Sequence, residues 1–265
     1  MPREDALLAR VGARRGEAAT LARLAELQRA WCFAQPFHNL DLLAGARCGA
    51  PPLDREAALE RCADGLGGPC HVQSWGFLSL LRLAGYEARL CGATISRPDD
   101  HLLVHVTLGE AAYLCDVGNG QPYLEPFPID RVHEQRHAGW CARTTPDGDG
   151  LVLKRRALDQ PTWRTVYRAR AEARRWEDFA SSIERHHREP GFGPFLSGLR
   201  VVRVGAASMI AVRDELVTVY REDSVDRTRL TDAELIRFIA GDLGLSALPV
   251  REAVDAWRAA AARAP

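Results

Sequence analysis

The sequence has almost no lysine. Lys154 is the only one among 35 basic residues, so nearly all of the positive charge is on arginine. The 35 basic residues are matched by 35 acidic residues, and the formal net charge is zero. A chain without excess positive charge lacks the global field that draws proteins to nucleic acids or anionic membranes. We therefore expect neither kind of partner.

Targeting and membrane signals are also missing. The N-terminal stretch Met1-Pro2-Arg3-Glu4-Asp5 is charged and has no apolar core of the kind found in signal peptides. No segment approaches the roughly 20 consecutive apolar residues that span a bilayer. These absences predict a cytoplasmic protein.

Paired cysteine spacings are absent as well. The seven cysteines are scattered, and no two stand in C-x-x-C spacing, so the sequence supports neither a zinc site nor a redox motif. The neighbouring His186 and His187 do not form an obvious metal pair, because adjacent helical side chains point in different directions. We expect free thiols, no bound metal, and this histidine pair on a solvated helix face.

What the chain does contain is a change of periodicity along its length. Its 46% hydrophobic and 26% charged content is ordinary for a globular protein. Apolar residues recur at helical intervals up to Gly85, then short alternating or apolar runs follow, and the last part mixes both patterns. We expect a helical domain over 1–85, an antiparallel sheet or β-barrel domain over 86–190 and an α/β domain over 191–265.

Individual elements follow from the same patterns. Helices are expected within 4–31, after Asp54 as N-cap, and over 70–84, 176–187, 231–243 and 248–262. Strands are expected over 87–95, 101–108, 113–117, 136–143, 150–157, 163–170, 199–204, 207–212 and 215–221.

The most informative stretch is the turn Gly65-Leu66-Gly67-Gly68-Pro69-Cys70, which leads into an apolar helix. Glycines permit a backbone that approaches a ligand closely, and Pro69 suits the start of a helix. Unpaired N–H groups and the helix dipole at that end stabilise an anion such as a thiolate. Cys70 is therefore a candidate nucleophile, although a small buried cysteine in a tight junction would give the same pattern.

A nucleophilic cysteine needs a base, and the base needs a group that orients it. His101 opens one expected strand and Asp116 ends the next, so a hairpin would place them side by side. His105 lies on the same strand face and is the alternative base. Asp116 could instead cap the following turn.

These positions resemble the arylamine N-acetyltransferases. The shared pattern is a Gly-Gly-x-Cys turn before a helix, a His that opens a strand and an Asp-Val-Gly at 116–118. The segment 36–40, Pro-Phe-His-Asn-Leu, is similar to the family's P-F-E-N-L, and Pro194-Phe195-Leu196 falls where the family has a similar stretch. The resemblance implies an α+β fold with an N-terminal helical bundle, a central antiparallel β-barrel, a C-terminal α/β lid and a papain-like Cys-His-Asp core.

The resemblance also implies an activity. An acyl group would move from a thioester donor to Cys70 and then to an amine, with His101 as the base and Asp116 as the orienting group. No cofactor would be bound permanently, because the donor, an acyl-CoA or an acyl carrier protein, is a substrate. The implied pocket residues are Phe37, Gly118, Asn119, Gly120 and Phe195.

The chain departs from the family pattern around this core. Leu66, Val72 and Ser74 stand where the family has Arg, Glu and Asn, and His38 and Asn119 replace a Glu and an aromatic residue. Because the three catalytic positions are retained and the residues around them differ, we expect the same chemistry on different substrates. Three alternatives remain: an amide synthase that takes its acyl chain from a carrier protein, a thioesterase or amidase with the same triad, and a non-catalytic binding module.

Overall fold

The first third of the chain folds into helices. The computed structural model, which describes residues 3–157 and 159–262, contains α1 (Arg3–Arg10), α2 (Leu21–Ala34), α3 (Leu40–Cys48), α4 (Arg55–Ala63) and α5 (Cys70–Leu83). The carboxylate of Asp54 accepts a hydrogen bond from the Ala57 N–H at 2.8 Å, which confirms the expected N-cap of α4. Helix α5 is buried along most of its length, because the barrel covers the side that the other helices leave open.

Eight antiparallel strands form the barrel, in the spatial order β5-β4-β3-β2-β9-β8-β7-β6. They are β2 (Glu87–Thr94), β3 (His101–Leu108), β4 (Ala111–Cys115), β5 (Phe127–Pro128), β6 (His133–His137), β7 (Trp140–Asp147), β8 (Gly150–Ala157) and β9 (Arg164–Arg170). The two edge strands come close, since the Gln135 side chain of β6 accepts hydrogen bonds from the N–H groups of Leu124 and Glu125, just before β5. The barrel is nearly closed.

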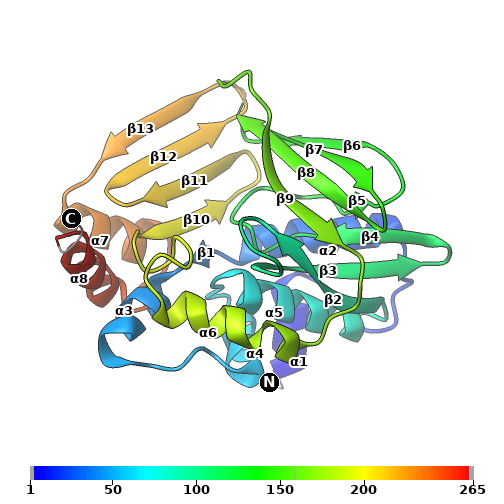
Figure 1. Ribbon diagram of the computed structural model, residues 1–265, viewed down its shortest axis with the longest axis horizontal. Coiled ribbons are helices and arrows are strands. Elements are labelled where there is room, and N and C mark those ends of the chain that lie inside the picture. The colour runs from blue at the N-terminus through cyan, green and yellow to red at the C-terminus, as the bar shows by residue number, and fades with distance from the viewer. Residues whose placement is uncertain (1–2, 158, 263–265) are drawn as a thin grey trace.

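A second antiparallel sheet has the order β1-β10-β11-β12-β13. Its strands are β1 (Phe37–His38), β10 (Arg200–Val204), β11 (Ser208–Arg213), β12 (Leu216–Arg221) and β13 (Val225–Arg229). Helix α7 (Asp232–Arg237), a π-helical turn η2 (Phe238–Asp242) and α8 (Val250–Ala261) cover it, and α8 packs on α3. Figure 1 shows this sheet and the barrel side by side above the helices, with η1 (Trp176–Phe179) and α6 (Ala180–Arg188) below the space between them.

The α+β fold expected from the sequence is confirmed, but some elements differ. The expected strand over 136–143 is wrong: it is a hairpin in which a tight turn at Ala138 and Gly139, with φ values of 48° and 72°, separates β6 from β7. Strands β1 and β13 and helix α3 were not expected. Among the described residues, no helix has the length and apolar character needed to cross a membrane.

Candidate active site

Cys70 is the first residue of α5 and lies at the bottom of a cavity of about 480 Å³. The preceding turn has a left-handed backbone at Gly67, with φ of 63°, which places Pro69 as the N-cap of the helix. The loop after β4 lies directly against Cys70, since a Cβ on Gly118 would lie 2.8 Å from the Cys70 Cα. The residue is only 5% exposed and is one of those that line the cavity.

His101 and Asp116 meet beside this cysteine. His101 opens β3 and Asp116 follows β4, and the pairing of these two strands brings His101 Nε2 to 3.1 Å from Asp116 Oδ1. The same oxygen accepts the Gly118 N–H at 3.1 Å. The Ser74 hydroxyl of α5 donates to the Leu102 carbonyl at 2.9 Å, which fixes the nucleophile helix against the strand that carries the base.

The electrostatics favour a charged imidazole. Burial alone would lower the pKa of His101, but the negative charge of Asp116, its hydrogen bond and the neighbouring Cys70 raise this pKa from 6.5 to about 10. Because Nε2 faces Asp116, Nδ1 is the ring nitrogen left for Cys70. The arrangement can hold a thiolate beside an imidazolium and present it to an electrophile in the cavity.

Comparison with known proteins identifies the family of this chain. A family model described as N-acetyltransferase matches residues 20–248, which is most of the chain. The chain belongs to the arylamine N-acetyltransferase family. It is therefore an acyltransferase by family. No curated protein sequence matches it.

Solved structures of arylamine N-acetyltransferases share the fold. The chain is similar to the Mycobacterium marinum protein, with 23% identity, a TM-score of 0.83 and coverage of 96% of this chain and 98% of that one. The M. marinum protein in complex with CoA gives 23% identity and a TM-score of 0.80, covering 96% of this chain and 97% of that chain. The Salmonella typhimurium protein gives 20% identity, a TM-score of 0.84 and coverage of 98% and 99%.

His38 is the one residue of the 36–40 segment that departs from the similar family stretch. His38, which replaces the family's Glu, donates from Nε2 to the Leu66 carbonyl at 2.8 Å while its Nδ1 accepts the Leu40 N–H. Burial lowers the pKa of His38, so the neutral ring that this pattern requires is favoured. A neutral side chain thus bridges to the backbone of Leu66, which itself replaces the family's Arg, and no charge is left unpaired.

Asn39 joins the nucleophile domain to the far end of the chain. Its Nδ2 donates to the carbonyls of Phe195 and Gly198, each at 2.7 Å, and its Oδ1 accepts the Arg200 N–H at 2.8 Å. The loop before β10 is therefore held by a residue 156 and 159 positions before the two carbonyls that it contacts.

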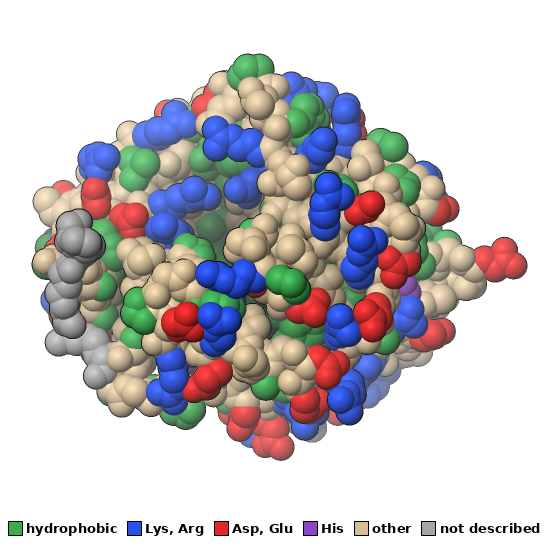
Figure 2. Space-filling model, in the orientation of Figure 1, with side chains coloured by type: hydrophobic (Ala, Val, Ile, Leu, Met, Phe, Trp, Pro, Cys, Tyr) green, Lys and Arg blue, Asp and Glu red, His purple; other side chains and the backbone are tan. Residues whose placement is uncertain are grey.

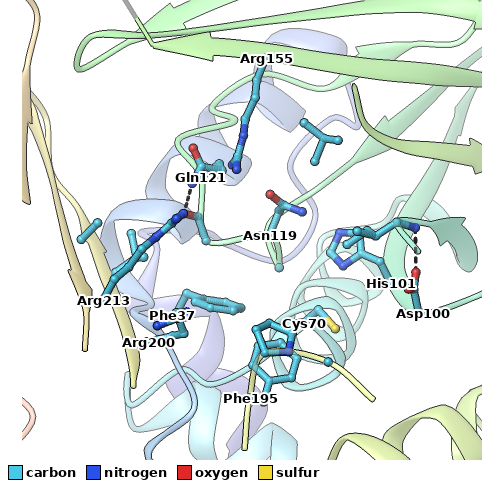
Figure 3. Close-up of a pocket in the computed structure, with 18 of the residues that line it drawn as sticks. Phe37, Cys70, Asp100, His101, Asn119, Gln121, Arg155, Phe195, Arg200 and Arg213 are labelled. Carbon is cyan, nitrogen blue, oxygen red and sulfur yellow. Dashed lines mark hydrogen bonds between the residues drawn. The ribbon is translucent and has the colours of Figure 1, made fainter. Parts of the chain in front are cut away.

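All five residues expected in the pocket line the cavity (Figure 3). Phe37 and Phe195 face each other with ring centroids 6.1 Å apart, while the loop from Gly118 to Gly120 forms the wall beside Cys70. His105, the alternative base, does not line the cavity. It lies opposite Arg89 in the β2–β3 ladder, and burial together with the Arg89 charge lowers its pKa to about 4.

Sequence reasoning missed several residues near the reacting atoms. The Tyr167 ring packs on His101 at 5.5 Å, and its hydroxyl, like Asp116 Oδ2, has no hydrogen-bond partner in the described part of the chain. The expectation of a solvated face was wrong for His186, which is buried between Phe192 and Phe195 and lines the cavity. Four arginines of the cavity wall were also missed, because their strands come together only in the folded molecule.

The thiols should differ in reactivity at low pH. At pH 6, iodoacetamide should modify Cys70 roughly a hundred-fold faster than Cys32, whose pKa is raised to about 12, first by burial and then by Asp116. The measurement is peptide mass spectrometry after quenched labelling. In a His101→Gln variant the imidazolium partner is lost, so the advantage of Cys70 should disappear. Equal labelling of the two thiols in the unmodified protein would contradict a stabilised thiolate.

Proposed function

We propose that this chain is a cysteine-dependent N-acyltransferase that carries an acyl group from a thioester donor to an amine through an acyl-Cys70 intermediate. The observation that supports this most directly is that Cys70 and His101 line the same cavity, while the buried Asp116 contacts the His101 ring from behind at 3.1 Å and raises its pKa. The family supports an N-acyl transfer, and the geometry supports these three residues as its machinery.

In the first half-reaction, the Cys70 thiolate attacks the thioester carbonyl. A carbon–sulfur bond forms, and the carbonyl electrons move onto oxygen, where the Cys70 N–H at the start of α5 is available as a donor. When the tetrahedral adduct collapses, the bond to the donor sulfur breaks and the imidazolium of His101 supplies the proton of the departing thiol. The product is an acyl-cysteine beside a neutral His101.

In the second half-reaction, a neutral amine attacks the acyl-cysteine. His101 accepts the proton that the amine nitrogen loses, and the bond between the acyl carbon and Cys70 breaks. The amide leaves, and the thiolate–imidazolium pair is restored. Asp116 holds the ring in position and favours its charged form throughout, without taking the proton.

A small-molecule acceptor and a CoA thioester are the substrates best supported. A cavity of about 480 Å³ is in the usual range for small ligands, and its lining includes the rings of Phe37, Phe192 and Phe195. CoA is bound in a structure of the M. marinum protein, which has a similar fold. We therefore propose an acyl-CoA as donor and an amine with an apolar ring as acceptor.

The proposal predicts a covalent intermediate. Incubation with acetyl-CoA in the absence of amine should add one acetyl group to the protein by intact mass, and added arylamine should remove it and yield the amide. The Cys70→Ala variant should show no adduct, whereas Cys48→Ala, which removes an exposed thiol remote from the cavity, should behave as the unmodified protein.

Other outcomes identify other functions. An adduct that forms only from an acyl carrier protein would replace the CoA donor with a carrier-bound one. Loss of the acyl group to water at the same rate with and without amine would indicate a thioesterase. No adduct from any thioester would contradict the transferase and leave a binding function.

A further inference from the structure

The cavity carries an excess of positive charge on the walls away from Cys70. Four arginines line it, namely Arg155 of β8, Arg164 of β9, Arg200 of β10 and Arg213 of β11. Figure 2 shows a hollow in this face of the molecule with several basic side chains along its border. The acyl-transfer steps described above use none of these arginines.

The acidic groups near the cavity are already satisfied. Asp100, the one acidic residue of the lining, accepts hydrogen bonds from its own loop, at the N–H groups of Ile95, Ser96 and Arg97 and at the Ser96 hydroxyl. Asp214 lies next to Arg213 in the chain, but it pairs with Arg200 at 3.3 Å and accepts the Leu199 N–H. Within 3–157 and 159–262, no carboxylate forms an ion pair with Arg155 or Arg213.

These two cations converge on one place. Figure 3 shows Arg155 and Arg213 reaching from different sheets toward Gln121, on the side of the cavity away from His101. Arg213 is an exposed residue of the cavity lining. Partial desolvation, and after it repulsion by the positive charges of Arg155 and Arg200, lower the pKa of its guanidinium. An anion between them would remove that repulsion.

Polar groups without partners surround the same place. Gln121 is 8% exposed; its Nε2 donates to the Gly120 carbonyl at 2.9 Å, and the atom without a partner in the described residues is Oε1, an acceptor that does not bind an anion. The indole N–H of Trp140, whose ring lies under the Arg155 guanidinium at 5.2 Å, is also unpaired there. An N–H donor and two forked guanidinium groups are suited to the oxygens of a carboxylate or phosphate.

We propose that Arg155 and Arg213 bind an oxyanion that one substrate carries at the end remote from its reacting group. This assignment rests on the proposed acyl transfer at Cys70 and names the substrate class of the same cavity. The expected source is the acceptor: an aromatic amine whose ring lies among the aromatic side chains and whose carboxylate reaches the two arginines. The other possible source of the same chemistry is an acidic group of the donor.

The acceptor arm compares 4-aminobenzoate with the neutral 4-aminobenzamide, using acetyl-CoA as donor. The unmodified protein should prefer the carboxylate in kcat/KM, and Arg213→Gln or Arg155→Gln should reduce that preference roughly ten-fold or more. The matched control is Arg221→Gln, on the adjacent strand β12, because this arginine pairs with Asp226 outside the cavity. Raised salt should weaken the preference of the unmodified protein only.

The donor arm compares acetyl-CoA with acetyl-pantetheine, which lacks the nucleotide phosphates, in the presence of the neutral amine. If the arginine variants reduce the preference for acetyl-CoA and leave the acceptor preference unchanged, the oxyanion belongs to the donor. If neither preference changes in Arg155→Gln, Arg213→Gln or the double variant, the oxyanion site is contradicted.

A binding measurement separates this proposal from the proposed function. Calorimetry with 4-aminobenzoate and the Cys70→Ala variant requires no acyl transfer, and adding Arg155→Gln and Arg213→Gln should weaken that binding by at least ten-fold. Binding that depends on the arginines in a protein that forms no acyl-cysteine would support the anion site and reject the transferase. Acyl transfer whose acceptor affinity and substrate preference are unchanged by the arginine substitutions would support the transferase and reject the anion site.

Discussion

Replacement of Asp116 by asparagine should lower the rate of acyl-cysteine formation roughly ten-thousand-fold, in line with the loss of an orienting carboxylate in comparable triads. Asparagine keeps the volume of a side chain that is fully buried, so the cavity should keep its shape. It removes the negative charge that holds the pKa of His101 at about 10, and burial then favours the neutral ring. Without an imidazolium, Cys70 loses the partner of its thiolate.

Single-turnover acylation with acetyl-CoA measures this effect, with Asp130→Asn as control, because Asp130 is an exposed barrel residue paired with Arg131. Stability supplies a second readout. The pKa of His101 is raised in the folded state. Its contribution to the free energy of unfolding is therefore complete below about pH 6.5 and is lost as the pH rises through about 10. In denaturant titrations, the free energy of unfolding of the Asp116→Asn variant should not show this decrease with rising pH. An acylation rate within three-fold of the unmodified protein would remove Asp116 from the mechanism.

Replacement of Gly67 by alanine should destabilise the protein by about 4 kcal/mol. The residue has φ of 63°, and a Cβ there would overlap the Pro36 carbonyl oxygen and lie 2.9 Å from its carbon. That oxygen accepts the Gly68 N–H at 3.1 Å and Gln73 Nε2 at 2.8 Å, so moving it breaks both bonds at the base of α5. Thermal unfolding should begin about 10 °C lower, and acylation of Cys70 should fall with it.

Gly12 gives a matched comparison. Its φ of 65° is nearly the same, but nothing lies within 4 Å of a Cβ placed there. Gly12→Ala should therefore show only the cost of the left-handed backbone, about 1 kcal/mol. Equal destabilisation by the two substitutions would mean that backbone strain, and not the contact with Pro36, requires glycine at position 67.

Local chemistry made much of the fold predictable. The Asp54 cap needs only a carboxylate three residues before an N–H, and Thr231 begins α7 with a capping box that Glu234 completes. The error over 136–143 arose because Ala138 occupies a left-handed turn position that its side chain does not reveal. Strand β13 was missed because its residues are mostly exposed and polar at the edge of its sheet.

The candidate site also contains residues that local sequence predicts and residues that only the tertiary structure brings together. The proximity of His101 and Asp116 could be predicted from the sequence because one hairpin brings them together, and the place of Cys70 at a helix start because a glycine turn precedes it. Arg155 and Arg213 could not be found, since they meet only when the barrel and the C-terminal sheet lie side by side. Tyr167 was missed for a similar reason, because its position beside His101 depends on the pairing of β2 with β9.

The pairing of β1 with β10 has a consequence for biosynthesis. Phe37 leaves the ribosome early, but its partner Val202 follows only after most of the chain has been translated. Such distant pairing slows folding, since the intervening polypeptide must first be ordered. Until β10 docks, a nascent chain already contains Cys70, His101 and Asp116 but lacks Arg200 and Val202 of the cavity wall, so we expect the cavity to be completed late in folding.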